Sequence, residues 1–227
     1  MIVPSMTHAE VYRELEKDRE YVTRWWRHNL EAQRRRVLKA RSLPVSLWFD
    51  YTSPRKVRYL FFTRIFDKKM RRILTGACAL RHTHDGLAAY TTWLGDQVLI
   101  RPMVLTPHMF KQYARPDRAN VQKTGIELIK HYFFHNSHGK DTTNPHVVGR
   151  SVRYNGEEHQ SCCVNEGVLL GQVYEDIYVV RTFITYEMTS GLQQKEFGAL
   201  RQKILDDRTM YEVAKGYYVD DYIPYSL

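Results

Sequence analysis

The residues of this chain whose types and spacing could carry out chemistry lie between positions 104 and 138. His108 follows Thr106-Pro107, and two further histidines, His131 and His135, are four residues apart. An imidazole transfers protons near neutral pH and also binds metal ions. The stretch is therefore compatible with a phosphodiester-handling site, with a metal site or with ordinary packing.

A metal site would draw on histidines that are close together in the sequence. The available donors are Glu127, His131, His135 and His138, together with His82 and His84. Histidines at i and i+4 lie on one side of a helix and can share an ion. The segment HYFFH, however, lacks the internal glutamate of the hydrolytic HExxH motif. We therefore expect no bound metal and no other cofactor, and a metal-dependent hydrolase is the third alternative for function.

Positive charge is concentrated in one part of the chain. The net charge is +9, and residues 24–81 hold sixteen Lys and Arg against three acids, a local charge of +13. Such a field attracts nucleic acid, because each neutralised phosphate releases condensed counterions. The alternative is a solvated surface that only keeps the protein soluble. The residues predicted to bind nucleic acid are Arg34, Arg35, Arg36, Lys39, Arg41, Arg58, Arg64, Arg72 and Arg81.

A long helix is predicted over residues 7–40. Apolar side chains such as Val11, Leu15 and Trp26 recur at helical spacing. Thr7 followed by Glu10 matches a capping box. The arginines at 34–36 fall near the end of this helix, where they either bind phosphates or complement the helix dipole.

Residues 43–105 are predicted to form an antiparallel meander of about five strands. Runs rich in aromatic and β-branched residues alternate with turns such as His84-Asp85-Gly86. The outward positions in this prediction include Arg58, Arg64, Arg72 and Arg81. The basic block is therefore expected across one face of the sheet, which would suit a shallow RNA or DNA surface.

Two helices are predicted after this meander. Thr106 as N-cap and proline at the first helical position predict a short helix from His108 to Ala114. A second helix is expected over about residues 121–136, and a polar, turn-rich loop follows it.

Three strands and a last helix are predicted in the remainder. The strands are roughly residues 149–154 or 159–164, then 167–174 and 177–186. The last strand is apolar on both faces, which predicts a central position in a sheet. Arg181 within it then needs a partner or an anion. A C-terminal helix follows Thr189 or Ser190.

The segment LTPHMFKQYARPDR, residues 105–118, resembles the S/T-x-H-A-x-x-R-M-x-x-R opening of small bacterial domains of the barnase/RelE-type ribonuclease fold. The segment YVVRTFIT is similar to their closing strand, so the resemblance covers residues 104–186. The chain departs from the pattern at Gln112, where arginine is expected, and at Tyr113, where methionine is expected. The second arginine aligns only after a shift to Arg115 or Arg118.

This resemblance implies metal-free RNA cleavage, in which the 2′-hydroxyl attacks the adjacent phosphate. It implies His108 as general acid or base, because histidine transfers protons near neutrality. It implies Arg115 and Arg181 as stabilisers of the phosphorane charge, since a guanidinium meets two oxygens at once. Thr182 or Thr185 would be a positioning hydroxyl. The alternative for His108 is a role in closing the first turn of its helix.

The predicted fold class is α+β: antiparallel sheets with a long N-terminal helix, two central helices and a C-terminal helix. We expect either two regions, residues 1–103 and 104–227, or one continuous domain. We expect a cytoplasmic protein without a membrane partner, since no segment has the uncharged length of a membrane span. We expect the three cysteines to be buried free thiols.

The expected function is nucleic-acid binding, with RNA favoured over DNA and a metal-independent endoribonuclease as its catalytic form. The alternative is a non-catalytic binding or assembly protein of a phage or mobile element. In that case the same basic face would hold DNA, RNA or an acidic protein.

Overall fold

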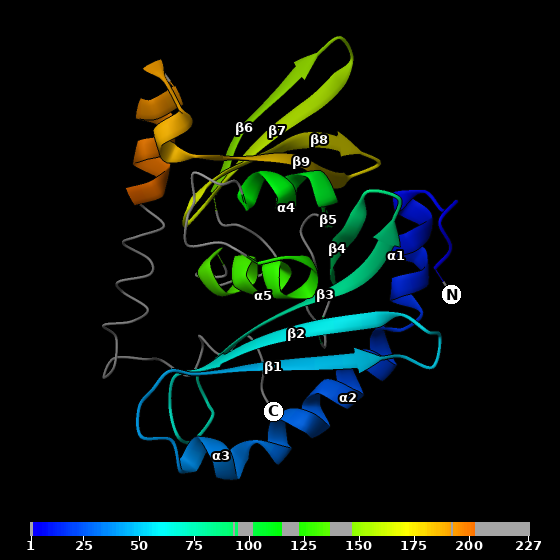
Figure 1. Cartoon of the computed structure of the whole chain (residues 1–227), viewed down its shortest axis with the longest axis vertical. Coiled ribbons are helices and arrows are strands. Elements are labelled where there is room, and N and C mark those ends of the chain that lie inside the picture. Colours follow the sequence, from blue (N-terminus) through cyan, green and yellow to red (C-terminus); the bar gives the residue numbers. More distant parts are fainter. Residues whose placement is uncertain are drawn as a thin grey trace.

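Nine strands form one sheet in the order β1-β2-β3-β4-β5-β9-β8-β7-β6 (Figure 1). The computed structural model describes residues 2–92, 94, 102–114, 123–136, 147–191 and 193–202, with only the backbone for residues 147–150. Neighbouring strands are antiparallel except β5 and β9, which pair in parallel. The strands are β1 (Val45–Thr52), β2 (Arg58–Ile65), β3 (Ile73–Thr83), β4 (Gly86–Thr92), β5 (Met103–Leu105), β6 (Val147–Tyr154), β7 (Glu157–Val164), β8 (Gly167–Tyr174) and β9 (Ile177–Thr185).

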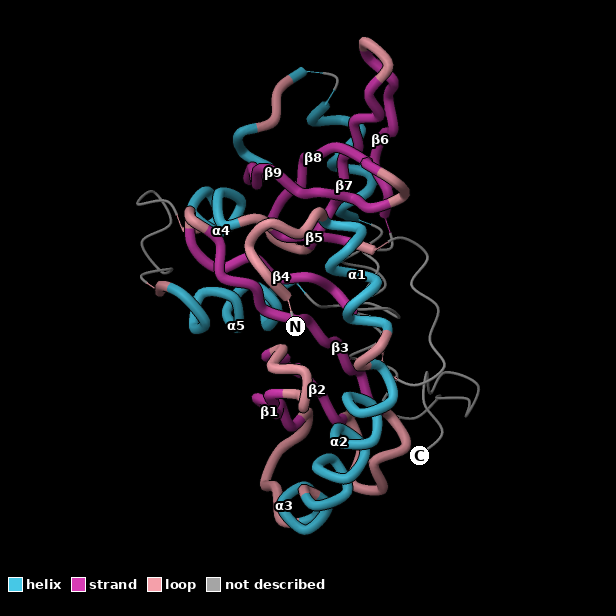
Figure 2. Tube along the Cα trace, turned by 90° about the vertical axis from the view of Figure 1, so that its right-hand side faces the viewer, coloured by secondary structure: helices cyan, strands magenta, loops and turns pink. Residues whose placement is uncertain are grey.

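Helices cover both faces of the sheet, so the molecule has three layers (Figure 2). Three helices, α1, α2 and α3, lie on one face, and α4 and α5 lie on the other. Residues 193–202 are also helical. The helices are α1 (His8–Glu16), α2 (Arg19–Ala32), α3 (Arg34–Leu38), α4 (Pro107–Tyr113), α5 (Gly125–Asn136) and the 3-10 helix η1 (Tyr186–Met188).

The predicted α+β class with one long N-terminal helix is wrong. The fold is mixed α/β, dominated by the nine-stranded sheet, and the N-terminal segment forms three short helices. The first break falls at Lys17-Asp18, where the fully buried Asp18 carboxylate accepts hydrogen bonds from Ser53 Oγ (2.6 Å) and Tyr59 OH (2.9 Å). The second break is at Gln33. At the first break the chain thus turns the Asp18 carboxylate into the β1–β2 region, and the helical periodicity of the sequence does not continue through it.

The two predicted meanders are joined into one sheet through β5 and β9. Met103, Val104 and Leu105 of β5 pair in parallel with Tyr178, Val179 and Val180 of β9. The predicted regional boundary near residue 104 therefore falls within a strand that hydrogen-bonds to both halves. The second meander has four strands, because both alternatives predicted for its first strand exist, as β6 and β7.

Several local predictions are confirmed. Thr7 and Glu10 form the capping box at the start of α1. The Thr106 hydroxyl caps α4 by accepting from the Met109 backbone N–H (3.3 Å). The β3–β4 hairpin turns at His84-Asp85, and β9 lies inside the sheet between β5 and β8.

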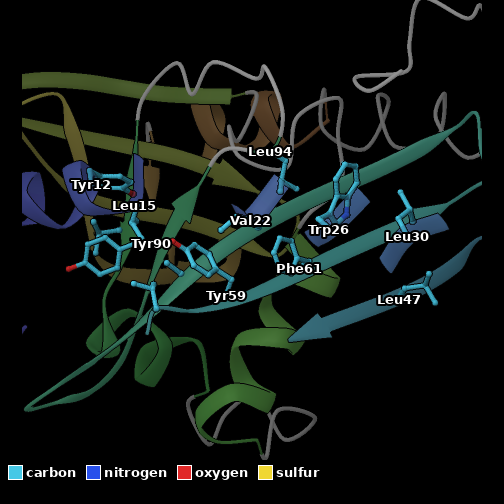
Figure 3. Close-up of a cluster of buried hydrophobic side chains, with 14 of the residues drawn as sticks. Tyr12, Leu15, Val22, Trp26, Leu30, Leu47, Tyr59, Phe61, Tyr90 and Leu94 are labelled. Atoms are coloured by element: carbon cyan, nitrogen blue, oxygen red, sulfur yellow. The ribbon is translucent and has the colours of Figure 1, made fainter. Parts of the chain in front are cut away.

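The core consists of two main clusters, one on each face of the sheet. Tyr59 and Phe61 of β2 face the N-terminal helices, where they pack with Trp26 and Leu30 (Figure 3). Leu60, between them in the sequence, faces the cluster that packs under α4 and α5. Strands buried on both faces read as continuous apolar runs, which is why VRYLFFTRIF shows little alternation.

The three cysteines are free and buried, as the sequence predicted. Burial raises the pKa of the Cys78 thiol to about 12 and that of Cys163 to about 11. Thiols with such pKa values are weak nucleophiles at neutral pH. Among the described helices, none combines the length and apolar character needed to cross a membrane.

Arg81 was predicted to face outward with the other sheet arginines, and this prediction is wrong. Its side chain is 9% exposed and lies on the face of the N-terminal helices. Nη1 donates to Tyr90 OH (3.0 Å), and Nη2 donates to the backbone carbonyls of Val3, Pro4 and Met6. Arg81 therefore fixes the N-terminal segment to the sheet and is not available to a phosphate.

His8 is part of the same buried cluster, and it makes the stability of the protein depend on pH. Tyr90 OH accepts from Arg81 and lies 2.9 Å from Nδ1 of His8, so the hydroxyl proton is directed at an unprotonated Nδ1. Burial, and then the Arg81 charge, lower the pKa of His8. The unfolded chain therefore binds this proton at a higher pH than the folded protein does. The contribution of neutral His8 to the free energy of unfolding is complete above the ordinary histidine pKa of about 6.5, and it is lost as pH falls below that value.

We expect His8→Gln to lose less stability on acidification than the wild-type protein. Glutamine offers Tyr90 an acceptor oxygen but does not titrate. The free energies of unfolding of both proteins, measured by urea denaturation across the acidic side of neutrality, should converge as pH falls. Parallel curves over that range would show that His8 does not contribute to the pH dependence of stability.

Candidate functional site

His108, the predicted acid or base, lies on the exposed side of α4. The buried side of that helix consists of Met109, Phe110 and Tyr113, which pack against β9. Nε2 of His108 lies 3.3 Å from Nε2 of Gln112, one turn further along. Gln112 is the residue that stands where the ribonuclease pattern expects arginine.

Arg181 and Thr182 lie on β9 and face away from α4. Arg181 is the extra residue in the register shift against β8, where Leu170 pairs with Thr182 but Gly171 pairs with Val180. Its Nη2 donates to Tyr174 OH (3.0 Å), which supplies the partner that an arginine in a central strand needs. The opposing Gly171 leaves no space for a side chain, because a Cβ there would lie 2.1 Å from the Val179 carbonyl oxygen.

A cavity of about 600 Å³ lies beside Arg181 and Thr182. Its other walls include His159, Gln172, Glu196 and Phe197. Phe197 belongs to a small cluster with Cys163 and Val168, whereas the neighbouring Cys162 and Leu169 face α4 and α5. Because successive strand residues face opposite sides of a sheet, this cavity and α4 lie on opposite faces.

The residues that the ribonuclease resemblance assigned do not form one site in the part of the chain that the structure describes. His108 is on the α4 face, and Arg181 and Thr182 line the cavity on the other face. Thr185 is half-buried at the end of β9. Arg115, like Arg118, lies outside the described residues.

Two arginines of β2, Arg58 and Arg64, and Arg72 just before β3 have partners within the protein. Arg58 forms a bidentate pair with Asp50 on β1 (Nε–Oδ1 2.9 Å, Nη2–Oδ2 2.5 Å). The guanidinium of Arg64 lies 5.1 Å from the centre of the Phe134 ring, and that of Arg72 lies 5.8 Å from the centre of the Phe66 ring. The expected continuous basic sheet face is therefore not formed by these residues.

Exposed cations gather instead at one end of the molecule, which we call the basic end. Val37 anchors α3 in the core there, so Arg35, Arg36 and Lys39 point to solvent. Residue pairing places the turn between β2 and β3 at the same end as the start of β1, because Val45, Ile65 and Ile73 are aligned (Figure 1). The exposed cations of the basic end are Arg35, Arg36, Lys39, Arg41, Lys68, Lys69 and Arg71.

Acidic side chains near the basic end are already engaged. Glu31 pairs with Arg34 (3.3 Å), and Asp67 accepts from the backbone N–H groups of Lys69 and Arg72. Within the described residues, the seven cations of the basic end form no ion pair. The sequence prediction named the cations around α3 as binding residues, but it did not name Lys68, Lys69 or Arg71 individually. Only the strand register brings the two groups together.

His131 and His135 form a cluster with two residues distant in the sequence. Their rings stack with centroids 4.3 Å apart. Glu166, in the turn between β7 and β8, accepts from Tyr113 OH (2.5 Å) and has Oε1 3.7 Å from Nδ1 of His135. Since the Tyr113 proton goes to Glu166, the same hydroxyl accepts from Nδ1 of His131 at 3.1 Å. The sequence carries no local signal for Glu166 or Tyr113 in such a cluster.

A groove of about 420 Å³ borders this cluster, and we call it the α5 groove. It is lined by Trp48, Lys123, Glu127, Lys130, His131, Phe134 and His135. Among the described residues, no group of three or more His, Cys, Asp or Glu side chains is arranged to hold a metal ion. His138, part of the alternative metal prediction, lies outside the described residues, and His84 lies in the β3–β4 turn with Nδ1 2.9 Å from Asp85.

Comparison of the chain with protein-family models, with curated proteins and with solved structures gives no match.

Proposed function

We propose that the protein binds nucleic acid, with RNA favoured over DNA, through its basic end. The observation that carries this proposal is the grouping of seven exposed cations at one end of the sheet, without an ion pair among the described residues. Cations gathered at one end of a sheet repel one another, and a polyanion relieves that repulsion. Each phosphate bound there releases condensed counterions, which supplies binding free energy without base recognition.

The proposal is limited to binding. His108 and Arg181 lie on opposite faces of the sheet, so RNA cleavage by that pair is not part of it. A cytoplasmic location belongs to the proposal, and three buried free thiols are compatible with a reducing compartment. The runner-up is an assembly protein of a phage or mobile element whose basic end holds an acidic protein.

Removing three charges from the basic end tests the proposal. The variant Arg35→Gln/Arg36→Gln/Lys39→Gln should bind a fluorescently labelled RNA at least about tenfold more weakly than the wild-type protein at moderate salt, because three phosphate contacts are lost. Fluorescence anisotropy measures the two affinities. Since all three side chains are exposed, we expect the variant to fold normally.

The matched control removes the same number of charges elsewhere. Lys111, Arg153 and Lys195 are exposed on α4, on β6 and in the helix of residues 193–202. Their replacement by glutamine lowers the net charge equally but should leave RNA affinity within about twofold. Equal losses of RNA affinity in both variants would mean that affinity depends only on the net charge of the protein. If the wild-type protein does not bind RNA or DNA, the runner-up takes the place of the proposal.

A further inference from the structure

The α5 groove has walls of two chemical kinds. Five of its residues, at positions 127, 130, 131, 134 and 135, lie on one side of α5, and Lys123 lies just before that helix. Trp48 of β1 forms the facing wall. The groove therefore combines two aromatic rings with cations and imidazoles, and its volume is within the usual range of ligand sites.

The aromatic wall is held in place by the sheet. Trp48 is half-buried, and Phe134 is 36% exposed although α5 packs its other aromatic residues inward. The ring of Phe62 lies 4.9 Å from that of Trp48 and 6.3 Å from that of Phe134. A nucleic acid base stacks on aromatic surfaces of this kind whatever its identity.

The polar wall offers donors for phosphates. Lys123 is exposed at the start of the groove, and Lys130 pairs with Glu127 at 2.7 Å. The side chain of His135 is 40% exposed. Its Nδ1 edge faces Glu166, so the opposite edge, with Nε2, is directed away from that carboxylate.

Glu166 is itself held rigidly by neighbouring elements. It accepts from Tyr113 OH of α4 and from Asn136 Nδ2 at the end of α5 (3.1 Å), and its backbone N–H donates to Asn136 Oδ1 (3.0 Å). Asn165 Nδ2 donates to the His135 carbonyl oxygen (3.0 Å). These bonds hold Glu166 and the backbone of His135 in place before any ligand arrives, and preorganised groups bind at a smaller entropic cost.

We propose that the α5 groove binds a single-stranded segment of nucleic acid, with bases against Trp48 and Phe134 and phosphates towards Lys123 and His135. The inference rests on the proposed function, and it adds a second contact of different character. The basic end would bind through phosphate charge alone, so it accepts single strands and duplexes alike. The groove accepts only unpaired bases, because the faces of paired bases are stacked inside a duplex.

The test compares a labelled single-stranded RNA with an RNA hairpin made largely of duplex. Phe134→Ala and Trp48→Ala should each weaken binding of the single strand by about tenfold, the expected effect of losing one stacked base, and leave the hairpin unaffected. The control Tyr154→Ala removes an aromatic ring that is 67% exposed on β6, outside the groove, and should leave both affinities unchanged.

A second pair of variants keeps the test valid if alanine disturbs packing. Phe134→Leu retains an apolar side chain under Arg64 but removes the ring, and His135→Gln retains a polar donor without the imidazole. Phe134→Leu, like Phe134→Ala, should weaken binding of the single strand and leave binding of the hairpin unchanged. His135→Gln should weaken single-strand binding by a smaller factor. Thermal unfolding of each variant confirms that it is folded.

The outcomes separate the two proposals. The proposal for the α5 groove would be overturned if folded groove variants bind the single strand as the wild-type protein does. It would also be overturned if they lose equal affinity for single strand and hairpin. Neither result would contradict the proposal for the basic end. If the wild-type protein binds neither RNA, the proposed function itself fails. Weaker binding of the single strand alone supports the groove.

Discussion

Arg81→Ala is expected to destabilise the protein by about 3 kcal/mol, because it removes a buried charged donor from four acceptors. The guanidinium hydrogen-bonds to Tyr90 OH and to three carbonyl oxygens of the N-terminal segment. Without it, residues 3–6 lose these hydrogen bonds to the sheet. Among the described residues, the Tyr90 hydroxyl then keeps His8 as its remaining partner. Urea or thermal unfolding monitored by circular dichroism measures the change.

Arg58→Ala is the matched control for Arg81. Arg58 lies on the adjacent strand and pairs with Asp50, but its side chain is 44% exposed. Exposed ion pairs contribute less than about 1 kcal/mol, so this variant should remain close to the wild-type stability. Similar losses in the two variants would contradict the structural role assigned to Arg81.

Asp18→Ala is expected to cost about 3 kcal/mol or more, since it leaves buried donors without their acceptor. The carboxylate is fully buried and accepts from Ser53 Oγ and Tyr59 OH, and Arg55 Nε lies 3.7 Å from Oδ1. Burial, and then the Asp18 charge, raise the pKa of Tyr59, so its hydroxyl remains a donor at all physiological pH values. The variant removes the link between the α1–α2 break and the β1–β2 turn.

Asp85→Ala provides the comparison for Asp18. Asp85 lies in the exposed β3–β4 turn, beside His84. Its loss should change the free energy of unfolding by less than about 0.5 kcal/mol. Equal stability of the two variants, measured by the same denaturation, would mean that Asp18 is not the anchor of the helix break.

Features of the fold that depend on a few adjacent residues could be predicted from the sequence. The Thr7-to-Glu10 capping box and the Thr106-Pro107 helix start each satisfy backbone N–H groups within one turn. The turns between strands are equally local, which is why the hairpin at His84-Asp85 could be recognised. The central position of β9 followed from its apolar residues on both faces.

Features that depend on distant residues could not be predicted. The parallel pairing of β5 with β9 joins residues more than seventy positions apart, and no pattern within either strand specifies it. At the helix break, Asp18 accepts hydrogen bonds from Ser53 and Tyr59, which are 35 and 41 positions away in the sequence. Periodicity alone therefore predicted one long helix where the structure has three.

The arrangement of the candidate site also depends on distant residues, so it could not be predicted from the sequence. The sequence does not distinguish the four arginines at 58, 64, 72 and 81. In the structure, Arg81 is buried and Arg58 is ion-paired, whereas Arg64 and Arg72 lie over aromatic rings. The cations of the β2–β3 turn join those around α3 only through strand register. Glu166 reaches His135 only because the β7–β8 turn packs against the end of α5.

The salt dependence of RNA binding tests most directly that the basic end contacts phosphates. For the wild-type protein, the logarithm of the binding constant should fall linearly with the logarithm of salt concentration, with a slope of about −3 to −5 if most of the seven cations contact phosphates of a single strand. The Arg35→Gln/Arg36→Gln/Lys39→Gln variant should have a slope shallower by about 2. A flat wild-type response, or identical slopes for wild type and variant, would contradict the proposed function.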